Sequence, residues 1–359
     1  MAFHAQTAFN ELRPHFQERV RRNELLARHS AFGVGGPADV WISLTSKEEL
    51  LDLVRLCAER RYPLLITGNG TNVLFADSGV RGIVARVALD GYRLEDDGED
   101  TALLIAEAGL SWPRLLHELA PLGWAGLEFG VGIPGTLGGG VISNAGAHND
   151  DLGQVLEWIE VLDARGCNVA EEDQLAVPLM RRYLHDELDL GYRHSRFRQQ
   201  RQVRFDKQGH LVLPPRGMIE PAEIIMLLGI HLHRSATQEL SANIAQYKQH
   251  RKLAEPAQRH AGTVFKDPPG EEASHLIDQV GLRGKTLGKA QISERNANYI
   301  VNWGGAQAAD VAALIMEAHR RVLEQLGVDL ELDVELLGEW EVHHLIQALE
   351  RGIQRELQG

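Results

Sequence analysis

The chain has 359 residues, 44% of them hydrophobic and 24% charged, which is the balance of a folded globular protein and excludes a disordered chain. At roughly 150 residues per domain, this length predicts about two domains. The formal net charge of −13 argues against a nucleic-acid-binding protein, because such proteins present a basic surface to the phosphate backbone.

Cysteine content and hydropathy favour a cytoplasmic protein. Only Cys57 and Cys167 are present, without CxxC spacing, so neither a disulfide framework nor a cysteine-based zinc site is expected. The first residues lack the apolar run of a signal peptide, and the chain has no stretch of about 18 apolar residues. We therefore expect no membrane insertion.

The first half of the chain predicts helices alternating with strands. Residues 8–28 place apolar side chains at helical spacing. A second helix is expected from Ser46, because Ser46 followed by Glu49 is a capping box. Further along, strands are expected over 64–66, 82–87, 102–107 and 158–162, and a short helix over 113–119.

The composition changes between residues 198 and 222, where a polar, turn-rich stretch predicts a domain junction or an inserted hairpin. The second half then predicts strands over 224–232 and 330–337, and helices over 236–253, 310–326 and 341–357. Gly327 is placed to end the helix over 310–326, whose apolar residues form one stripe. This order is typical of the α/β or α+β class, with a nucleotide-sized ligand between the halves.

Two glycine-rich loops, GNGTN over 68–72 and GVGIPGTLGGG over 130–140, favour a dinucleotide site. Glycine lets a backbone approach a ligand closely, so that N–H groups can surround a pyrophosphate. Neither loop is a standard fingerprint: Val73 replaces the third glycine of G-x-G-x-x-G, and no P-loop pattern occurs. The alternative is that these glycines serve only turns and close packing.

Taken together, the loops and later motifs resemble the UDP-N-acetylenolpyruvoylglucosamine reductase family. In chain order the matching blocks are FGVGGPA (32–38), GNGTNVL (68–74), GLEF (126–129), GIPGTLGG (132–139), NAGA (144–147), YRHS (192–195), GTVFK (262–266) and GKAQIS (288–293). They extend over nearly the whole chain, from about residue 20 to 340, and GIPGTLGG with NAGA is the most specific part.

The resemblance implies an α+β fold with a two-lobed FAD-binding region of the vanillyl-alcohol-oxidase (PCMH) type, followed by a smaller α/β substrate-binding domain. The expected parts are a helical lead-in (1–30), the FAD-binding region (31–198, with lobes over about 31–90 and 91–198), an insertion or junction (199–222), the substrate domain (223–340) and a helical tail (341–359). Because the insertion contains no Tyr, the chain resembles the compact form of the family with an insertion.

The activity implied by the resemblance is reduction of UDP-N-acetylenolpyruvoylglucosamine to UDP-N-acetylmuramate in peptidoglycan precursor synthesis. FAD would be bound non-covalently, NADPH would be the reductant, and a monomer without a metal ion is expected. The expected cofactor-binding residues are Gly68, Asn69, Gly70, Thr71, Asn72, Gly132, Ile133, Pro134, Gly135, Thr136, Gly138, Gly139, Asn144 and Gly146. The expected substrate-binding residues are Tyr192, Lys266 and Gln291.

Three residues match the catalytic positions of the family. Arg193 would bind the substrate carboxylate, since a guanidinium offers two parallel donors and stays charged. Thr263 stands where the family generally has the proton-donating Ser, and its hydroxyl has the same capacity. Asp333 occupies the position of a family Glu and is shorter by about 1.5 Å, a difference comparable with the ~1 Å misplacements that slow reactions.

Alternatives remain at these positions. Glu331 and Glu335 are expected on the strand face of Asp333 and would replace it if the register differed. Asp267 is unusual so close to a nucleotide diphosphate, because it would repel the diphosphate unless a cation such as Lys266 offsets it. His231-x-His233 has a spacing suited to metal ligands, but no third ligand is evident, so no metal site is expected.

Two other functions fit part of this pattern. A related flavin oxidase with another small substrate would share the glycine loops but would not need Arg193, Thr263 and Asp333 together. A non-redox protein that binds nucleotide sugars would explain the departures at Thr263, Asp267 and Asp333. Use of NADPH and of the enolpyruvyl substrate distinguishes the reductase from both.

Overall fold

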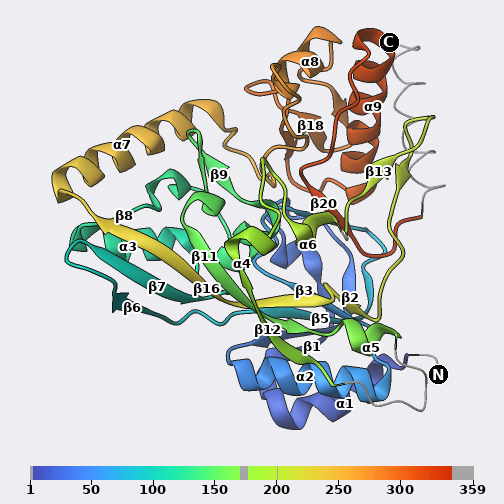
Figure 1. The fold of residues 1–359 in the computed structure, drawn as a ribbon. Helices are drawn as coiled ribbons and strands as arrows, with labels where there is room; N and C mark the ends of the chain where they lie inside the picture. Colours follow the sequence, from blue (N-terminus) through green and yellow to red (C-terminus); the bar gives the residue numbers. More distant parts are fainter. Residues whose placement is uncertain (1–2, 170–176, 200, 342–359) are drawn as a thin grey trace.

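The structure is a computed structural model, and it describes residues 3–169, 177–199 and 201–341. Two sheet-based lobes and a C-terminal domain surround a central region (Figure 1). In the part of the chain that is described, no helix is both long and apolar enough to cross a lipid bilayer. The helix expected over 341–357 falls on residues outside the described ranges, apart from residue 341 itself.

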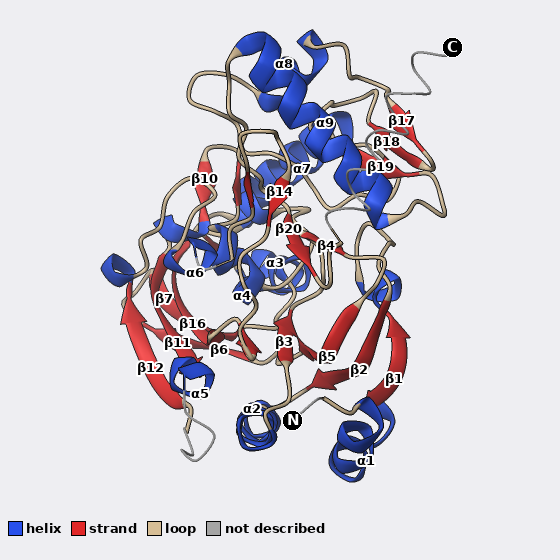
Figure 2. Cartoon of the chain, turned by 90° about the vertical axis from the view of Figure 1, so that its right-hand side faces the viewer, coloured by secondary structure: helices blue, strands red, loops and turns tan. Residues whose placement is uncertain are grey.

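The first lobe is a five-stranded sheet with two helices packed on one face. Its order is β1 (Val20–Leu25), β2 (Pro37–Leu44), β5 (Val80–Val87), β3 (Leu64–Thr67) and β15 (Ile219–Glu220), and all neighbours are parallel except β1 and β2. Helices α1 (Ala5–Phe16) and α2 (Lys47–Arg60) lie under this sheet in Figure 2. Ser46 begins α2 as predicted, since its hydroxyl accepts a hydrogen bond from the Glu49 amide at 3.2 Å.

The helix expected over 8–28 is partly wrong, because it ends at Phe16 and residues 20–25 form β1. Gln17 has a positive φ (51°, with ψ −127°), a backbone conformation outside the helical regions, which interrupts the helix. In β1, Val20 and Glu24 are buried and the other residues are exposed, and pairing with β2 outweighs local helix propensity.

The second lobe is an antiparallel six-stranded sheet. Its order is β12 (Leu179–Leu184), β11 (Leu156–Asp163), β16 (Glu223–Arg234), β7 (Thr101–Glu107) and β6 (Tyr92–Asp96), with β8 (Trp124–Ala125) paired to the end of β16. Helices α3 (Trp112–Leu119) and α4 (Leu137–Ser143) share its core. The strand β16 was expected to open the C-terminal domain at residue 223. That boundary is wrong, because β16 pairs with β11 and β7 in the middle of this sheet.

The C-terminal domain has its own apolar core. It contains α8 (Ala273–Gln279), α9 (Ala308–Leu326) and a small sheet of β17 (Thr286–Leu287), β18 (Ala290–Ile292) and β19 (Ile300–Asn302). Gly327 ends α9 in the left-handed conformation (φ 72°), as predicted. The long helix α7 (Thr237–Ala254) leads from β16 to this domain (Figure 1).

A short parallel pair brings the C-terminal domain back to the first lobe. β20 (Glu335–Leu337) pairs with β4 (Val73–Phe75), which directly follows the loop over 68–72. The strand expected over 330–337 is therefore shorter than predicted, and Leu332 forms only an isolated bridge with Phe265. This pairing carries Asp333 to the first glycine-rich loop.

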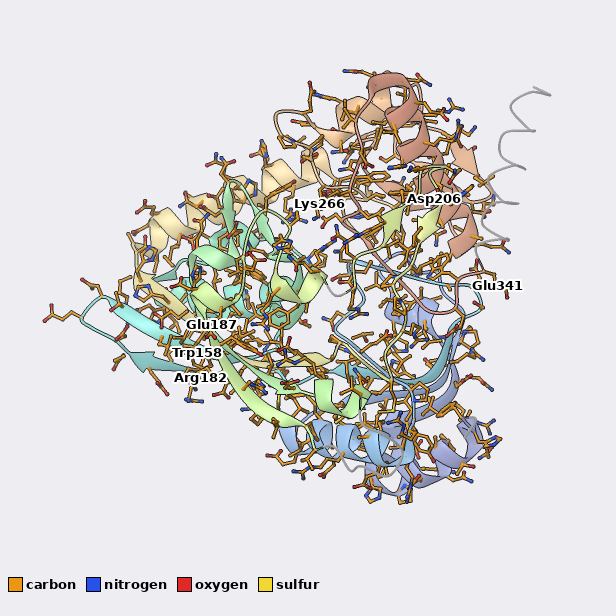
Figure 3. All side chains as sticks on the ribbon, turned by 45° about the vertical axis from the view of Figure 1, so that its right-hand side comes forward. Trp158, Arg182, Glu187, Asp206, Lys266 and Glu341 are labelled. Carbon is orange, nitrogen blue, oxygen red and sulfur yellow. The ribbon has the colours of Figure 1, made fainter. Side chains whose placement is uncertain are left out.

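The segment over 201–220, called the strap below, connects all three parts. After the short helix α6 (Arg196–Gln199), its hairpin of β13 (Arg204–Phe205) and β14 (Leu211–Val212) packs on the C-terminal domain, and β15 then joins the first lobe. Asp206, near the hairpin turn, lies beside that domain in Figure 3. Of the junction or inserted hairpin expected between 198 and 222, the structure has a hairpin at this place, and its being an insertion relative to the family stays a prediction.

Candidate active site

A cavity of about 1050 Å³ lies where the two lobes and the C-terminal domain meet. This volume is at the upper end of ordinary ligand pockets, so a large ligand fits. Twelve of the expected cofactor-binding residues line it: Gly68, Asn69, Gly70, Thr71, Asn72, Gly132, Ile133, Pro134, Thr136, Gly138, Gly139 and Gly146.

The two glycine-rich loops lie against each other in the cavity wall. A Cβ atom at Gly68 would lie 2.9 Å from Oγ1 of Thr136, and a Cβ atom at Gly135 would lie 2.6 Å from Oγ1 of Thr71. Thr136 also begins α4, because its hydroxyl accepts a hydrogen bond from the Gly139 amide at 3.3 Å. These glycines therefore serve close packing, and the same packing presents bare backbone to the cavity, which suits a dinucleotide.

Gly135 and Asn144 are the two expected cofactor-binding residues outside the cavity lining. Asn144 is buried, accepts a hydrogen bond from the Gly153 amide at 2.8 Å and donates one to the carbonyl of Gly191 at 2.9 Å. It thereby connects the NAGA loop to the segment that carries Arg193, which is a supporting position beside the cavity.

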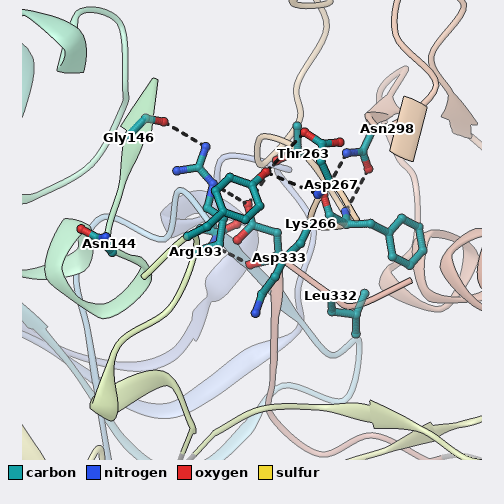
Figure 4. Close-up of polar contacts among 12 residues, drawn as sticks. Asn144, Gly146, Arg193, Thr263, Lys266, Asp267, Asn298, Leu332 and Asp333 are labelled. Atoms are coloured by element: carbon teal, nitrogen blue, oxygen red, sulfur yellow. Dashed lines mark hydrogen bonds and ion pairs between the residues drawn. The ribbon is translucent and has the colours of Figure 1, made fainter. Parts of the chain in front are cut away.

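Arg193, Thr263 and Asp333 come together in the cavity wall (Figure 4). Thr263 donates its hydroxyl hydrogen bond to Oδ2 of Asp333 at 3.1 Å, and Nε of Arg193 lies 3.6 Å from the same oxygen. Arg193 has a left-handed backbone conformation (φ 50°) and donates to the carbonyl of Gly146 at 2.9 Å. A cation, a hydroxyl and a carboxylate from three distant segments thus face one space.

The backbone of Asp333 is fixed from both sides. Its amide donates to the carbonyl of Val264 at 2.8 Å, and its carbonyl accepts from the Asn72 side chain at 2.8 Å. The Asp333 side chain is only 9% exposed. Its carboxylate position is therefore set by the backbone and not by a flexible stem.

The neighbouring carboxylates differ from the expected arrangement. Glu335 lines the cavity with Asp333, whereas Glu331 is exposed and pairs with Lys266 at 3.0 Å. The expectation that all three share one face is wrong for Glu331, because strand pairing begins only at Glu335 and alternation does not extend back to 331.

Tyr192, Lys266 and Gln291 lie outside the cavity lining, and their contact with substrate stays a prediction. Lys266 is on the C-terminal domain side of the central region in Figure 3. The amide of Gln291 accepts from the Trp303 indole at 2.6 Å and donates to the Gly284 carbonyl at 3.0 Å.

Asp267 is engaged by the protein itself. Its carboxylate accepts from the Ala273 amide at the start of α8 at 2.9 Å and from the Tyr192 hydroxyl at 3.3 Å. The carboxylate that was expected to repel a bound diphosphate, that of Asp267, therefore already accepts hydrogen bonds from the protein.

One face of α7 also lines the cavity, which the sequence interpretation missed. Tyr247 stacks on His148 with ring centres 4.0 Å apart, and Arg251 follows one turn later. Burial lowers the pKa of His148, and the nearby His250 and Arg251 lower it further. The i, i+4 spacing of Tyr247 and Arg251 in a charged helix was the available signal.

Two residues that follow α7 in the chain, Glu255 and Tyr299, also line the cavity. Glu255 forms an ion pair with Arg251, and burial raises the pKa of its carboxyl although Arg251 opposes the shift. Burial and the neighbouring Glu255 raise the pKa of Tyr299 to about 12, so its hydroxyl stays protonated at neutral pH. Both side chains therefore add polar groups to the cavity wall, and Tyr299 is close enough to Arg193 for that charge to oppose the rise in its pKa.

Outside the cavity, the structure brings a histidine and two carboxylates together. Ligand atoms of Asp97, Glu157 and His231 lie within 4.8 Å of one another, with both carboxylates exposed. Sequence spacing around His231 missed these groups because they come from other strands and their connections. Exposed groups of this kind assemble frequently without an ion, and we assign no metal site to them.

Two family profiles match the chain. Residues 38–169 match an FAD binding domain, and residues 254–337 match the C-terminal domain of UDP-N-acetylenolpyruvoylglucosamine reductase. The first match agrees with the position of the glycine-rich loops, and the second begins where α7 ends.

Full-length comparisons agree with the profiles. The chain is 34% identical over 326 residues to the UDP-N-acetylenolpyruvoylglucosamine reductase of Heliobacterium modesticaldum, covering 90% of this chain and 92% of the relative. It is 36% identical over 318 residues to that of Chloroflexus aggregans, covering 89% and 97%. The crystal structure of the reductase from Thermus caldophilus superimposes with a TM-score of 0.65 and 31% identity, covering 89% and 98%. The expected α+β fold with a vanillyl-alcohol-oxidase-type FAD-binding region is confirmed.

Proposed function

The chain belongs to the UDP-N-acetylenolpyruvoylglucosamine reductase family, whose members are FAD-containing oxidoreductases, and we propose that NADPH is its reductant. It reduces the enolpyruvyl group of UDP-N-acetylenolpyruvoylglucosamine to the lactyl group of UDP-N-acetylmuramate. The family membership and the FAD expected from the sequence are thereby confirmed. In the net reaction, NADPH gives a hydride and becomes NADP⁺, and one further proton reaches the substrate.

The backbone of the cavity wall is suited to binding FAD. The loops over 68–72 and 132–139 would hold it, because they present glycine backbone to a cavity large enough for a dinucleotide. Hydride transfer is the chemistry that FAD supplies when bound. The residues discussed next act on the substrate.

The gathering of Arg193, Thr263 and Asp333 at one wall is the observation that carries the proposal. Hydride addition to the enolpyruvyl double bond builds enolate-like charge beside the substrate carboxylate, and the fixed guanidinium of Arg193 stabilises that charge. The hydroxyl of Thr263 gives its proton to the second carbon, which completes the saturated product, and takes up the replacement proton from solvent. Asp333 sets the direction of this hydroxyl through their hydrogen bond.

An anaerobic two-step experiment tests the proposal. The holoenzyme is first titrated with NADPH and then mixed with UDP-N-acetylenolpyruvoylglucosamine, while the flavin absorbance is followed. Bleaching by NADPH and prompt recovery with the sugar nucleotide are expected. Bleaching without recovery would instead indicate a flavin oxidase with another substrate, and binding of the sugar without bleaching would indicate a non-redox binding protein.

A monomer in the cytoplasm is the proposed physical state. The support for a monomer is that Arg193, Thr263 and Asp333 of one chain already meet at one wall of the cavity. Light scattering of the holoenzyme tests this statement, and a stable dimer would contradict it.

A further inference from the structure

Arg198 is a buried guanidinium next to the candidate site. Its side chain is 5% exposed, and Nη2 donates to the carbonyl of Leu332 at 3.2 Å and to the carbonyl of Asp333. The same nitrogen lies 3.3 Å from Oδ1 of Asp333. Arg198 belongs to α6 beside the second lobe, whereas Asp333 precedes β20 in the C-terminal domain, so this contact joins two parts of the molecule.

The two oxygens of Asp333 therefore face different guanidinium groups. Arg193 lies near Oδ2, which also accepts from Thr263, and Arg198 lies near Oδ1. Taking a guanidinium out of water is costly unless a partner charge and hydrogen bonds compensate. The carboxylate and the two carbonyl groups compensate this cost in part through Nη2, while Nη1 of Arg198 and Oδ1 of Asp333 are buried without a hydrogen-bond partner among the described residues.

We propose that Arg198 is a positioning residue that holds Asp333, so that the hydroxyl of Thr263 stays aimed beside Arg193. This inference rests on the proposed function. An Asp side chain has one rotatable bond fewer than a Glu side chain, so the position of its carboxylate depends closely on the position of its backbone. Arg198 holds that backbone at residues 332 and 333 and leaves Oδ2 for Thr263.

The half-reactions separate this role from a structural one. In Arg198→Gln, bleaching by NADPH is expected within about threefold of the wild-type rate, because the glycine-rich loops are untouched. Recovery with the enolpyruvyl substrate is expected to slow on the order of 100-fold, the effect of a ~1 Å misplacement. Arg198→Lys, which keeps the charge without the planar fork, is expected to regain part of that rate.

Arg196→Gln is the matched control on the same short helix. Arg196 lies over the ring of Tyr183 and 3.6 Å from Glu223, outside the cavity lining. This variant is expected to unfold at lower urea concentration and to show wild-type rates in both half-reactions. Loss of the second half-reaction in the control would overturn the inference, since any weakening of α6 would then suffice.

A double-mutant cycle tests whether Arg198 acts through Asp333. In the Asp333→Asn background, adding Arg198→Gln is expected to slow flavin recovery by less than about threefold, because the interaction is already lost. The inference would be overturned if the rate losses of Asp333→Asn and Arg198→Gln multiplied in the double variant. It would also be overturned if flavin recovery were unchanged in Arg198→Gln, or if both half-reactions slowed equally in that variant. If Arg198→Gln does not fold, the same cycle is run with Arg198→Lys. Failure of the wild-type flavin to recover would overturn the proposed function, which the other outcomes leave standing.

Discussion

The hydroxyl of Thr263 points to a carboxylate of the protein itself. Its oxygen is 3.1 Å from Oδ2 of Asp333, and the methyl group of Thr restricts rotation about χ1. In the proposed role as proton donor, a hydroxyl whose oxygen is already held in place avoids part of the entropic cost of reaching the reactive geometry. Substitutions at residues 263 and 333 can therefore show separately whether the reaction needs the functional group itself and whether it needs the position of that group.

Replacing Thr263 by Val keeps the shape of the side chain and removes the hydroxyl. We expect flavin bleaching by NADPH to be unchanged and recovery with the enolpyruvyl substrate to slow by about 10²–10⁴-fold, the usual contribution of a general acid. Thr263→Ser retains the hydroxyl and should recover within about tenfold of wild type. Stopped-flow absorbance measures both steps, and equal rates for Val and Ser would exclude a proton-donating role.

Asp333→Glu restores the length that the family resemblance associates with this position. The side chain borders a cavity of about 1050 Å³, so one more methylene has room. We expect turnover to be preserved or raised, whereas Asp333→Asn should lower it on the order of 100-fold through loss of the charge. A large loss in Asp333→Glu, with unchanged urea unfolding, would contradict the assignment of this position.

At the scale of elements, α2 shows how local signals anchor the first lobe. Arg19, after α1, donates to Glu49 in the first turn of α2, and the Thr45 amide donates to the same carboxylate at 2.8 Å. The hydrogen bond from Arg19 is the main cause that lowers the pKa of Glu49 to about 2. Two elements distant in sequence are thereby joined at a helix N-terminus, where a carboxylate is also favoured by the helix dipole.

The pH dependence of this contact has a definite sign. The pKa of Glu49 is about 2 in the folded chain and about 4.3 unfolded, so its stabilisation is complete above about pH 4.3 and is lost towards pH 2. We expect Glu49→Gln to lower the free energy of unfolding by about 1 kcal/mol at pH 7. In urea titrations the difference from wild type should shrink between pH 4 and 3.

Asp52→Asn on the same helix is the control, because Asp52 is exposed. It should differ from wild type by less than about 0.5 kcal/mol at every pH. A Glu49→Gln effect that stays constant from pH 7 to pH 3 would show that the lost contact does not depend on ionisation.

Local sequence patterns predicted single helices, strands and motifs better than they predicted which of these contact one another in the fold. The Ser46 cap, the apolar stripe of α9 and the motifs around Arg193 and Thr263 are sequence-local, and each is where the sequence places it. The pairing of β16 inside the second lobe and the contact of Arg198 with Asp333 depend on residues more than 60 positions away. Periodicity carries no information about such partners, so these features required the structure.

For the whole molecule, several connections hold the C-terminal domain against the two lobes. They include the short parallel pair of β20 with β4, the helix α7 and the strap over 201–220. In the strap, the ring of Phe205 stacks on the buried His319 of α9, with centres 3.6 Å apart. The cavity has walls from all three parts, so its shape depends on these connections.

Phe205→Ala tests how firmly the strap holds the domain. We expect the free energy of unfolding to fall by about 2 kcal/mol, less than the 3–5 kcal/mol of a fully buried Phe, because Phe205 is half-buried. Hydrogen exchange of the hairpin amides should accelerate, because the hairpin loses an apolar contact with α9. Val212→Ala, at a 50% exposed position of the same hairpin, should change stability by less than about 0.5 kcal/mol. Urea unfolding and exchange mass spectrometry measure both effects.

Equal effects of the two substitutions would mean that the stack on His319 does not anchor the strap. A selective effect of Phe205→Ala would instead establish that the stack on His319 holds the hairpin against the C-terminal domain, which carries Asp333 to Arg193 and Arg198.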